Sequence, residues 1–89
     1  MIKIAFSSSF KRAFKRRIAG NVERENTFRT KVELFTNNPF AASLKAHKLS
    51  GKLKDYWSFS IEYDLRVIFY FSNEEHAIFV DIGSHKEVY

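Results

Sequence analysis

The sequence predicts an α+β domain with elements in the order β-α-α-β-β-β, in which a helical hairpin packs on one face of a mainly antiparallel four-stranded sheet. Three observations support this. A short alternating stretch opens the chain, two segments with helical spacing of apolar side chains follow, and the second half alternates apolar and polar side chains as strands do. A length of 89 residues suffices for one domain, so we expect a single domain over residues 1–89.

The first strand and first helix are predicted by two different periods. Residues 1–7 alternate apolar and polar side chains, which is typical of a half-buried strand. One of three consecutive serines can then cap a helix. In that helix Phe10, Phe14 and Ile18 recur at steps of four and share one apolar stripe. Gly20 can end the helix in a left-handed conformation.

A second helix is predicted from about residue 23 to residue 36. Its apolar positions Phe28, Val32 and Phe35 follow at spacings of four and three, so they lie on one side. The sequence Asn-Asn-Pro at 37–39 stops it, because the residue before a proline is disfavoured in a helix. Two helices joined by a short turn predict an antiparallel hairpin.

The rest of the chain predicts three strands. Residues 53–63 alternate apolar and polar side chains, residues 65–71 are rich in branched and aromatic side chains, and residues 77–82 form a third apolar segment. A tight connection at 63–64 and a polar turn at 72–75 separate them. The opening strand must join this sheet, because an isolated strand has no partner for its backbone.

Charge is distributed unevenly along the chain. The net charge is +5, yet residues 1–54 hold thirteen Lys and Arg against three acids, and residues 55–89 hold two against seven. Such a split indicates a basic surface that attracts a polyanion such as nucleic acid. The alternative is that the basic residues only solvate the outer faces of the helices.

Composition excludes some classes of protein. Without cysteine the chain can form neither a disulfide framework nor a thiolate metal site. No signal peptide is visible, and the longest apolar run, Val67–Phe71, is too short to span a bilayer. We therefore expect a cytoplasmic protein with no membrane partner.

Several polar residues in the second half could carry chemistry. Histidine suits proton transfer near neutral pH, and the planar guanidinium of arginine matches two phosphate oxygens. The residues of these types are widely spaced, so only the fold could bring them together, and spacing alone also allows a plain surface role for His76 and an ion pair for Arg66. The three histidines match no known metal cluster. The candidates are His47, Asp64, Arg66, His85 and Tyr89.

Three segments, in this order, resemble the RelE/ParE superfamily of toxins. Residues 47–58, HKLSGKLKDYWS, are similar to its H-x-L-x-G-x-L-K-x-Y-x-S segment, and residues 63–69, YDLRVIF, to its D-x-R-[VL]-[IV]-[FY] strand. Residues 81–89, DIGSHKEVY, resemble its terminal D-I-G-x-H-x-x-V-Y signature. The resemblance covers nearly the whole chain and is strongest to the YafQ branch. It implies a RelE-like fold for the single domain.

The resemblance also implies a function. It indicates the toxin of a type II toxin–antitoxin system: a ribosome-dependent, metal-independent endoribonuclease that cuts mRNA by transesterification, leaving a 2′,3′-cyclic phosphate and a 5′-hydroxyl. It implies no cofactor. A cognate antitoxin would neutralise the toxin, and the complex would bind operator DNA through that antitoxin. Two alternatives stay open because the fold serves several activities: a ParE-like gyrase inhibitor, and a catalytically degenerate repressor component bound to antitoxin.

Roles follow residue by residue from the resemblance. His47 and His85 match proton-transfer histidines, Asp64 an acid near the active centre, Arg66 the arginine at the phosphate and Tyr89 a terminal aromatic that orients substrate. Ser60 stands where YafQ-like members tend to carry a further histidine, which leaves the identity of the base open. RNA would be held by Lys45, Lys48, Lys52 and Lys54, with Trp57 or Tyr56 as stacking groups.

Overall fold

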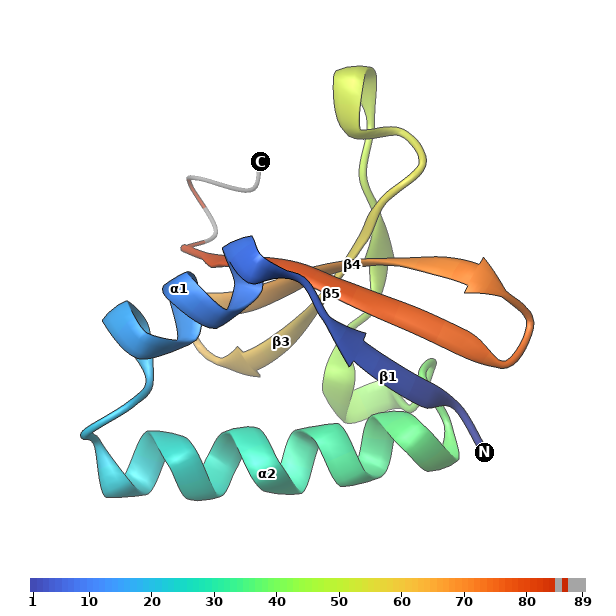
Figure 1. The fold of residues 1–89 in the computed structure, drawn as a ribbon. Helices are drawn as coiled ribbons and strands as arrows, with labels where there is room; N and C mark the ends of the chain where they lie inside the picture. Colours follow the sequence, from blue (N-terminus) through green and yellow to red (C-terminus); the bar gives the residue numbers. More distant parts are fainter. Residues whose placement is uncertain (85, 87–89) are drawn as a thin grey trace.

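The computed structural model describes residues 1–84 and 86, and it confirms the predicted α+β class and element order. Two helices and a sheet make up the domain, with short 3-10 helices η1 and η2 in the connections between them (Figure 1). Neither helix within the described part of the chain has the length and apolar character needed to cross a membrane. The elements are β1 (Lys3–Phe6), α1 (Ser8–Arg17), α2 (Val22–Asn37), η1 (Ala42–Leu44), β2 (His47–Lys48), η2 (Gly51–Leu53), β3 (Trp57–Glu62), β4 (Leu65–Asn73) and β5 (His76–Gly83).

The sheet has five strands in the order β1-β5-β4-β3-β2, rather than the four predicted. Strand β1 runs parallel to β5, and the other pairs are antiparallel. The additional strand, β2, has only two residues and pairs His47 with Ser58 of β3. Two residues are too few to show a period of two, which is why the sequence pattern did not reveal this strand.

The predicted start of the strand over residues 53–63 is also wrong. Residues 51–53 form the 3-10 turn η2, and β3 begins only at Trp57. Gly51 enters the turn with φ +67°, and the amide of Tyr56 donates to the Leu53 carbonyl at 2.9 Å, which closes the loop on itself. Leu53 fits the apolar alternation of a strand, but its backbone forms part of this turn.

The helices begin and end as the sequence indicates. The amide of Phe10 donates to Ser7 Oγ at 3.0 Å, so the first of the three serines caps α1. Gly20 has φ +90°, the left-handed conformation expected beyond the helix end. The amide of Arg24 donates to Asn21 Oδ1 at 3.1 Å, which caps α2.

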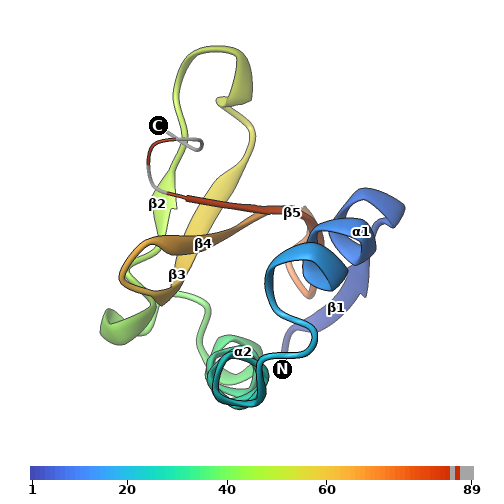
Figure 2. The same cartoon turned by 90° about the vertical axis from the view of Figure 1, so that its left-hand side faces the viewer.

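Both helices cover the same face of the sheet (Figure 2). The ring of Phe79 in β5 lies 5.5 Å from Phe10 of α1 and 5.3 Å from Phe35 of α2, measured between centroids. Phe35 also packs on Phe59 at 5.1 Å and Phe69 at 4.9 Å. Aromatic rings from both helices and three strands therefore form the core, and the predicted one-sided packing is confirmed.

The opposite face of the sheet is left open by the helices. Side chains of β3 and β4 at the alternate positions, such as Ser58, Arg66 and Tyr70, belong to this face. The segment from β2 to β3 rises from it, on the side of the sheet away from α2 (Figures 1 and 2). We call residues 49–56 the raised hairpin. The open face and the raised hairpin frame the candidate site.

Candidate functional site

Arg66 lies on the open face and is only 7% exposed. Its Nε donates to Ser58 Oγ at 2.9 Å, and its Nη2 donates to the carbonyl oxygens of Lys45 at 2.6 Å and Ser58 at 3.3 Å. Lys45 has a left-handed backbone, with φ 50°, at the end of η1. A buried charge is tolerated only when it is hydrogen-bonded, and these three bonds supply that compensation. They also fix the guanidinium against β3 and the end of η1.

His47 lies beside this guanidinium. Its Nδ1 is 3.4 Å from Arg66 Nη2, so the structure brings together two of the residues that the sequence singled out. Arginine can only donate hydrogen bonds, and therefore Nδ1 must be the acceptor. In the neutral ring the proton then resides on Nε2. The imidazole itself is exposed on the edge strand β2.

Asp64 lies two residues before Arg66, in the turn between β3 and β4, and lines a pocket of about 310 Å³ with Arg16, Arg17 and Arg24 of the two helices. Arg24 is paired there with Glu62 at 2.7 Å. Ser84 lines the same pocket and follows Gly83, the register partner of Arg66. The cluster of all five candidates stays a prediction, because two of them lie outside the described residues.

The last two candidates, His85 and Tyr89, lie outside the described residues. The sheet register still provides one relevant observation, since Arg66 pairs with Gly83 at the end of β5. The described chain thus leaves the sheet directly beside Arg66.

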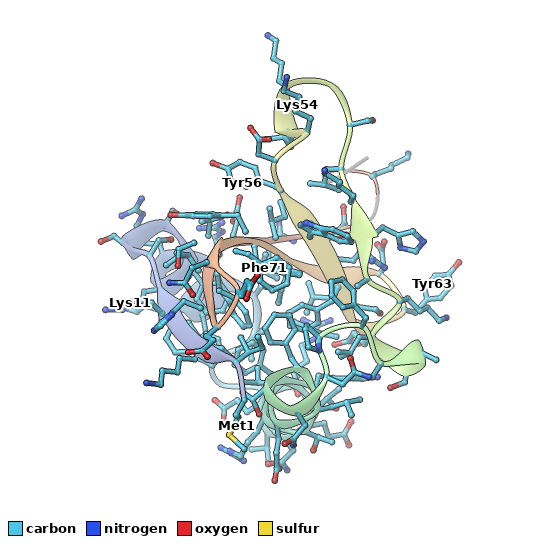
Figure 3. The ribbon with its side chains drawn as sticks, turned by 90° about the vertical axis from the view of Figure 1, so that its right-hand side faces the viewer. Met1, Lys11, Lys54, Tyr56, Tyr63 and Phe71 are labelled. Atoms are coloured by element: carbon cyan, nitrogen blue, oxygen red, sulfur yellow. The ribbon has the colours of Figure 1, made fainter. Side chains whose placement is uncertain are left out.

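The four lysines are all exposed. Lys48 belongs to β2 and is the register partner of Trp57, so it shares the face of that residue. Lys52 and Lys54 belong to the raised hairpin, where Figure 3 shows Lys54 at the outer end. Lys45 contributes its carbonyl to Arg66 while its side chain is exposed. Their positions are compatible with contacts to an RNA backbone.

Trp57 lies on the face opposite to Ser58 and Arg66. Its ring packs against Phe40 at 5.3 Å and Phe71 at 6.3 Å, on the helix-facing side of the sheet. Consecutive strand residues point to opposite faces, so Trp57 and the buried Ser58 are necessarily on opposite sides. The alternative aromatic, Tyr56, lies on the open side, where its ring is 5.6 Å from that of Tyr70.

Two residues of the site escaped the sequence reasoning. Ser58 is fully buried and holds Arg66, and Tyr70 shares the open face with it. Tyr70 is an even number of positions from Arg66 on one strand, so alternation could have placed it on the same face. Nothing in the sequence distinguishes Ser58 from any other serine. Over residues 1–84 and 86, no group of three or more His, Asp or Glu side chains is arranged to hold a metal ion.

Comparison with known proteins places these features in context. A family model described as bacterial toxin of type II toxin–antitoxin system, YafQ, matches residues 2–89. No curated protein sequence matches the chain. A metal-bound toxin from Helicobacter pylori is 27% identical, with all of both chains covered and a TM-score of 0.74.

Two further solved structures share the fold. A YoeB/ParE toxin from Agrobacterium tumefaciens is 18% identical, with 94% of this chain and 99% of that chain covered and a TM-score of 0.77. The DinJ–YafQ complex from E. coli contains a chain that is 19% identical, with 100% and 99% covered and a TM-score of 0.69.

Proposed function

The chain belongs to the YafQ family of toxins of bacterial type II toxin–antitoxin systems, and we propose that it is a ribosome-dependent, metal-independent endoribonuclease that cuts mRNA. One observation carries the proposal. A nearly buried arginine, held by Ser58 and by the Lys45 carbonyl, lies 3.4 Å from His47 on a sheet face that the helices leave open. A pure binding protein has no chemical reason to assemble such a pair.

The reaction is an internal transesterification. The 2′-oxygen attacks the phosphorus and loses its proton to a base, and the bond from phosphorus to the 5′-oxygen breaks as an acid protonates that oxygen. The products are a 2′,3′-cyclic phosphate and a 5′-hydroxyl. Negative charge builds on the phosphate oxygens during the attack, and a preorganised guanidinium such as that of Arg66 stabilises it. Its hydrogen bonds to Ser58 and to the Lys45 carbonyl keep this group in place.

The orientation of the His47 ring gives it a specific role. With Nδ1 turned to Arg66, the neutral ring presents an N–H at Nε2, which suits a hydrogen bond to a phosphate oxygen. We therefore assign the abstraction of the 2′-proton to another group. His85 is our candidate, because it follows Gly83, the register partner of Arg66. Tyr89 would stack on or orient the substrate.

Asp64 receives an indirect role in this proposal. It lines a pocket with Arg16, Arg17 and Arg24, so it would neutralise and order these arginines at the end of the sheet.

The partner would be a protein antitoxin, as in the E. coli DinJ–YafQ complex. We propose that a cognate antitoxin silences this toxin in the cytoplasm and carries the operator-binding surface of the complex. The exposed lysines of the raised hairpin, Lys52 and Lys54, would contact RNA on the ribosome.

The test is primer extension on mRNA after induction of the toxin and of single variants. The His85→Ala variant should lose proton transfer, a factor of roughly 10²–10⁴, and growth arrest should disappear with it. The matched control is His76→Ala, because that ring contacts Asn73 in the turn between β4 and β5. Growth arrest without new RNA ends, accompanied by loss of gyrase supercoiling, would contradict the proposal and identify a gyrase inhibitor.

A further inference from the structure

Two tyrosines meet on the open face of the sheet. The ring centroids of Tyr56 and Tyr70 are 5.6 Å apart, with an angle of 46° between the ring planes, and both residues are half-buried. Tyr70 alternates with Ile68 and Arg66 along β4, so all three belong to one face. In Figure 3, Tyr56 lies between the outer end of the raised hairpin and the sheet.

Both rings are attached to ordered backbone. The carbonyl of Tyr56 accepts from the amide of Leu49 at 2.9 Å, and its amide donates to the Leu53 carbonyl at 2.9 Å. Leu49 is itself 5% exposed and fastens the base of the raised hairpin. Tyr70 is on β4, which is paired with β3 on one side and β5 on the other. The two rings are therefore held in place before any ligand binds, which lowers the entropy cost of binding.

Their hydroxyl groups make no hydrogen bond within residues 1–84 and 86, and neither oxygen is a buried atom without a partner, so both are open to solvent. The surroundings are cationic on the hairpin side, where Lys52 and Lys54 are exposed. An aromatic surface next to exposed cations is the combination that binds single-stranded nucleic acid.

The spacing connects this pair to the reacting phosphate. Tyr70 is four positions after Arg66, which corresponds to about 13 Å along β4. We propose that Tyr56 and Tyr70 form a base-stacking subsite, which holds a nucleotide further along the strand from the one whose phosphate meets Arg66. The subsite rests on the proposed function and adds to it how the substrate strand is aligned. Every base has a stacking face, so the subsite selects single-stranded RNA rather than one sequence.

The experiment removes either the tyrosine ring from the protein or one base from the oligonucleotide. The probes are a fluorescent single-stranded oligonucleotide, with 2′-deoxy nucleotides so that it cannot be cleaved, and a set of versions each lacking one base. Fluorescence anisotropy with the purified full chain measures affinity. The Tyr70→Leu variant should bind the intact probe about 10-fold more weakly. One abasic probe should bind the wild type with a similar loss of affinity relative to the intact probe. With this probe, the Tyr70→Leu variant should bind no more weakly than the wild type.

Matched variants separate stacking from folding. Tyr70→Phe keeps the ring and should bind like the wild type, and Tyr63→Leu is the control, because Tyr63 is fully exposed and lies apart from Tyr56 in Figure 3. Tyr56→Leu repeats the test if Tyr70→Leu fails to fold. Three results would overturn the subsite. The affinity losses from Tyr70→Leu and from removal of a base could add for every abasic probe, Tyr63→Leu could lose as much affinity as Tyr70→Leu, or the wild type could fail to bind the intact probe. RNA cleavage measured separately in cells decides the proposed function: cleavage without stacking rejects only the subsite, and stacking without cleavage rejects only the enzyme.

Discussion

The two faces of the sheet are built from the same strands but are stabilised in different ways. On the covered face Phe59, Phe69 and Phe79 are completely buried against Phe35 of α2. On the open face the buried groups include the polar Ser58, at 0% exposure, and the charged Arg66, at 7%. Alternation along each strand sends the aromatic core residues to one side and these polar side chains to the other. The covered face thus owes its stability to removal of apolar surface from water, at about 25 cal/mol per Å².

The open face has to satisfy its polar groups instead. Arg66 is compensated by hydrogen bonds to Ser58 and to the Lys45 carbonyl. Such bonds contribute little net stability, although their loss leaves buried donors and acceptors unsatisfied. Burial of a side chain therefore has different consequences on the two faces of the sheet. A substitution on the covered face should lower the stability of the domain, and a substitution on the open face should lower activity first.

The largest effect is expected on the covered face, for Phe79→Ala. Phe79 contacts rings of both helices and of β3 and β4, so its loss leaves a cavity at the centre of the core. The free energy of unfolding should fall by about 3–5 kcal/mol, measured by urea titration. Tyr63→Ala, at a fully exposed position, should change it by less than about 0.5 kcal/mol. A loss for Phe79→Ala below that of an exposed position would refute the assignment of the core.

The next largest effect is expected for Arg66→Ala, which should lower both activity and stability although it lies on the open face. RNA cleavage should drop by about 10²–10³, because the charge that stabilises the transition state is gone. Stability should also fall by about 1–3 kcal/mol, because Ser58 and the Lys45 carbonyl lose their donor. Arg66→Lys restores charge without the planar fork and should recover only part of the rate.

Single-turnover cleavage and urea titration separate the two effects of Arg66. The control is Arg29→Ala, whose exposed side chain bonds only Asn26 in the described part of the chain. If Arg66→Ala were destabilised but cleaved RNA at the normal rate, the arginine would be purely structural.

A smaller change in rate is expected for His47→Ala. If this ring only donates Nε2–H to a phosphate oxygen, its removal should cost about 10-fold, or about 1.4 kcal/mol, well short of the loss expected for His85→Ala. His47→Gln offers both an acceptor for Arg66 and a donor for phosphate, and it should be closer to wild type. A loss as large as that of His85→Ala would show that His47 transfers the proton itself.

The smallest effect on the fold belongs to Lys52→Glu combined with Lys54→Glu. Both side chains are exposed on the raised hairpin, so the free energy of unfolding should be unchanged. Binding to ribosomes should weaken, and the slope of log affinity against log salt should decrease by about 0.7–0.9 for each phosphate that a lysine no longer neutralises. Lys31→Glu is the control, since the ammonium of Lys31 contacts the Ser43 carbonyl. Binding that does not depend on salt would contradict the role of the hairpin.

Most of the fold could be predicted from periodicity. Helices α1 and α2 and strands β4 and β5 carry long patterns, because each buries one face against the core. The connection from 45 to 56 could not be predicted, since its path depends on Gly51, on the left-handed Lys45 and on the hydrogen bonds of Arg66. These are tertiary contacts and leave no period in the sequence.

The sequence predicted which residues belong to the site better than it predicted where they lie relative to one another. Resemblance named His47 and Arg66, and the fold brings them together. Its placement of Asp64 stays a prediction, and the turn at 63–64 brings this residue to the arginine pocket of the helices. The resemblance assigned Trp57 to RNA contacts, and alternation along β3 puts its ring on the covered face. Distance along a chain does not reveal which end or face of a sheet a side chain reaches.

The pairing of β1 with β5 has a consequence for the timing of synthesis. Ile4 is opposite Ala77 in this parallel pair, so β1, made first, has no strand partner until the ribosome has produced nearly the whole described chain. The same late segment supplies Phe79 to the core and Gly83 beside Arg66. Folding that depends on such non-local contacts is slowed by the entropy cost of closing long loops. The sheet and the core are therefore completed only after the last strand has been synthesised.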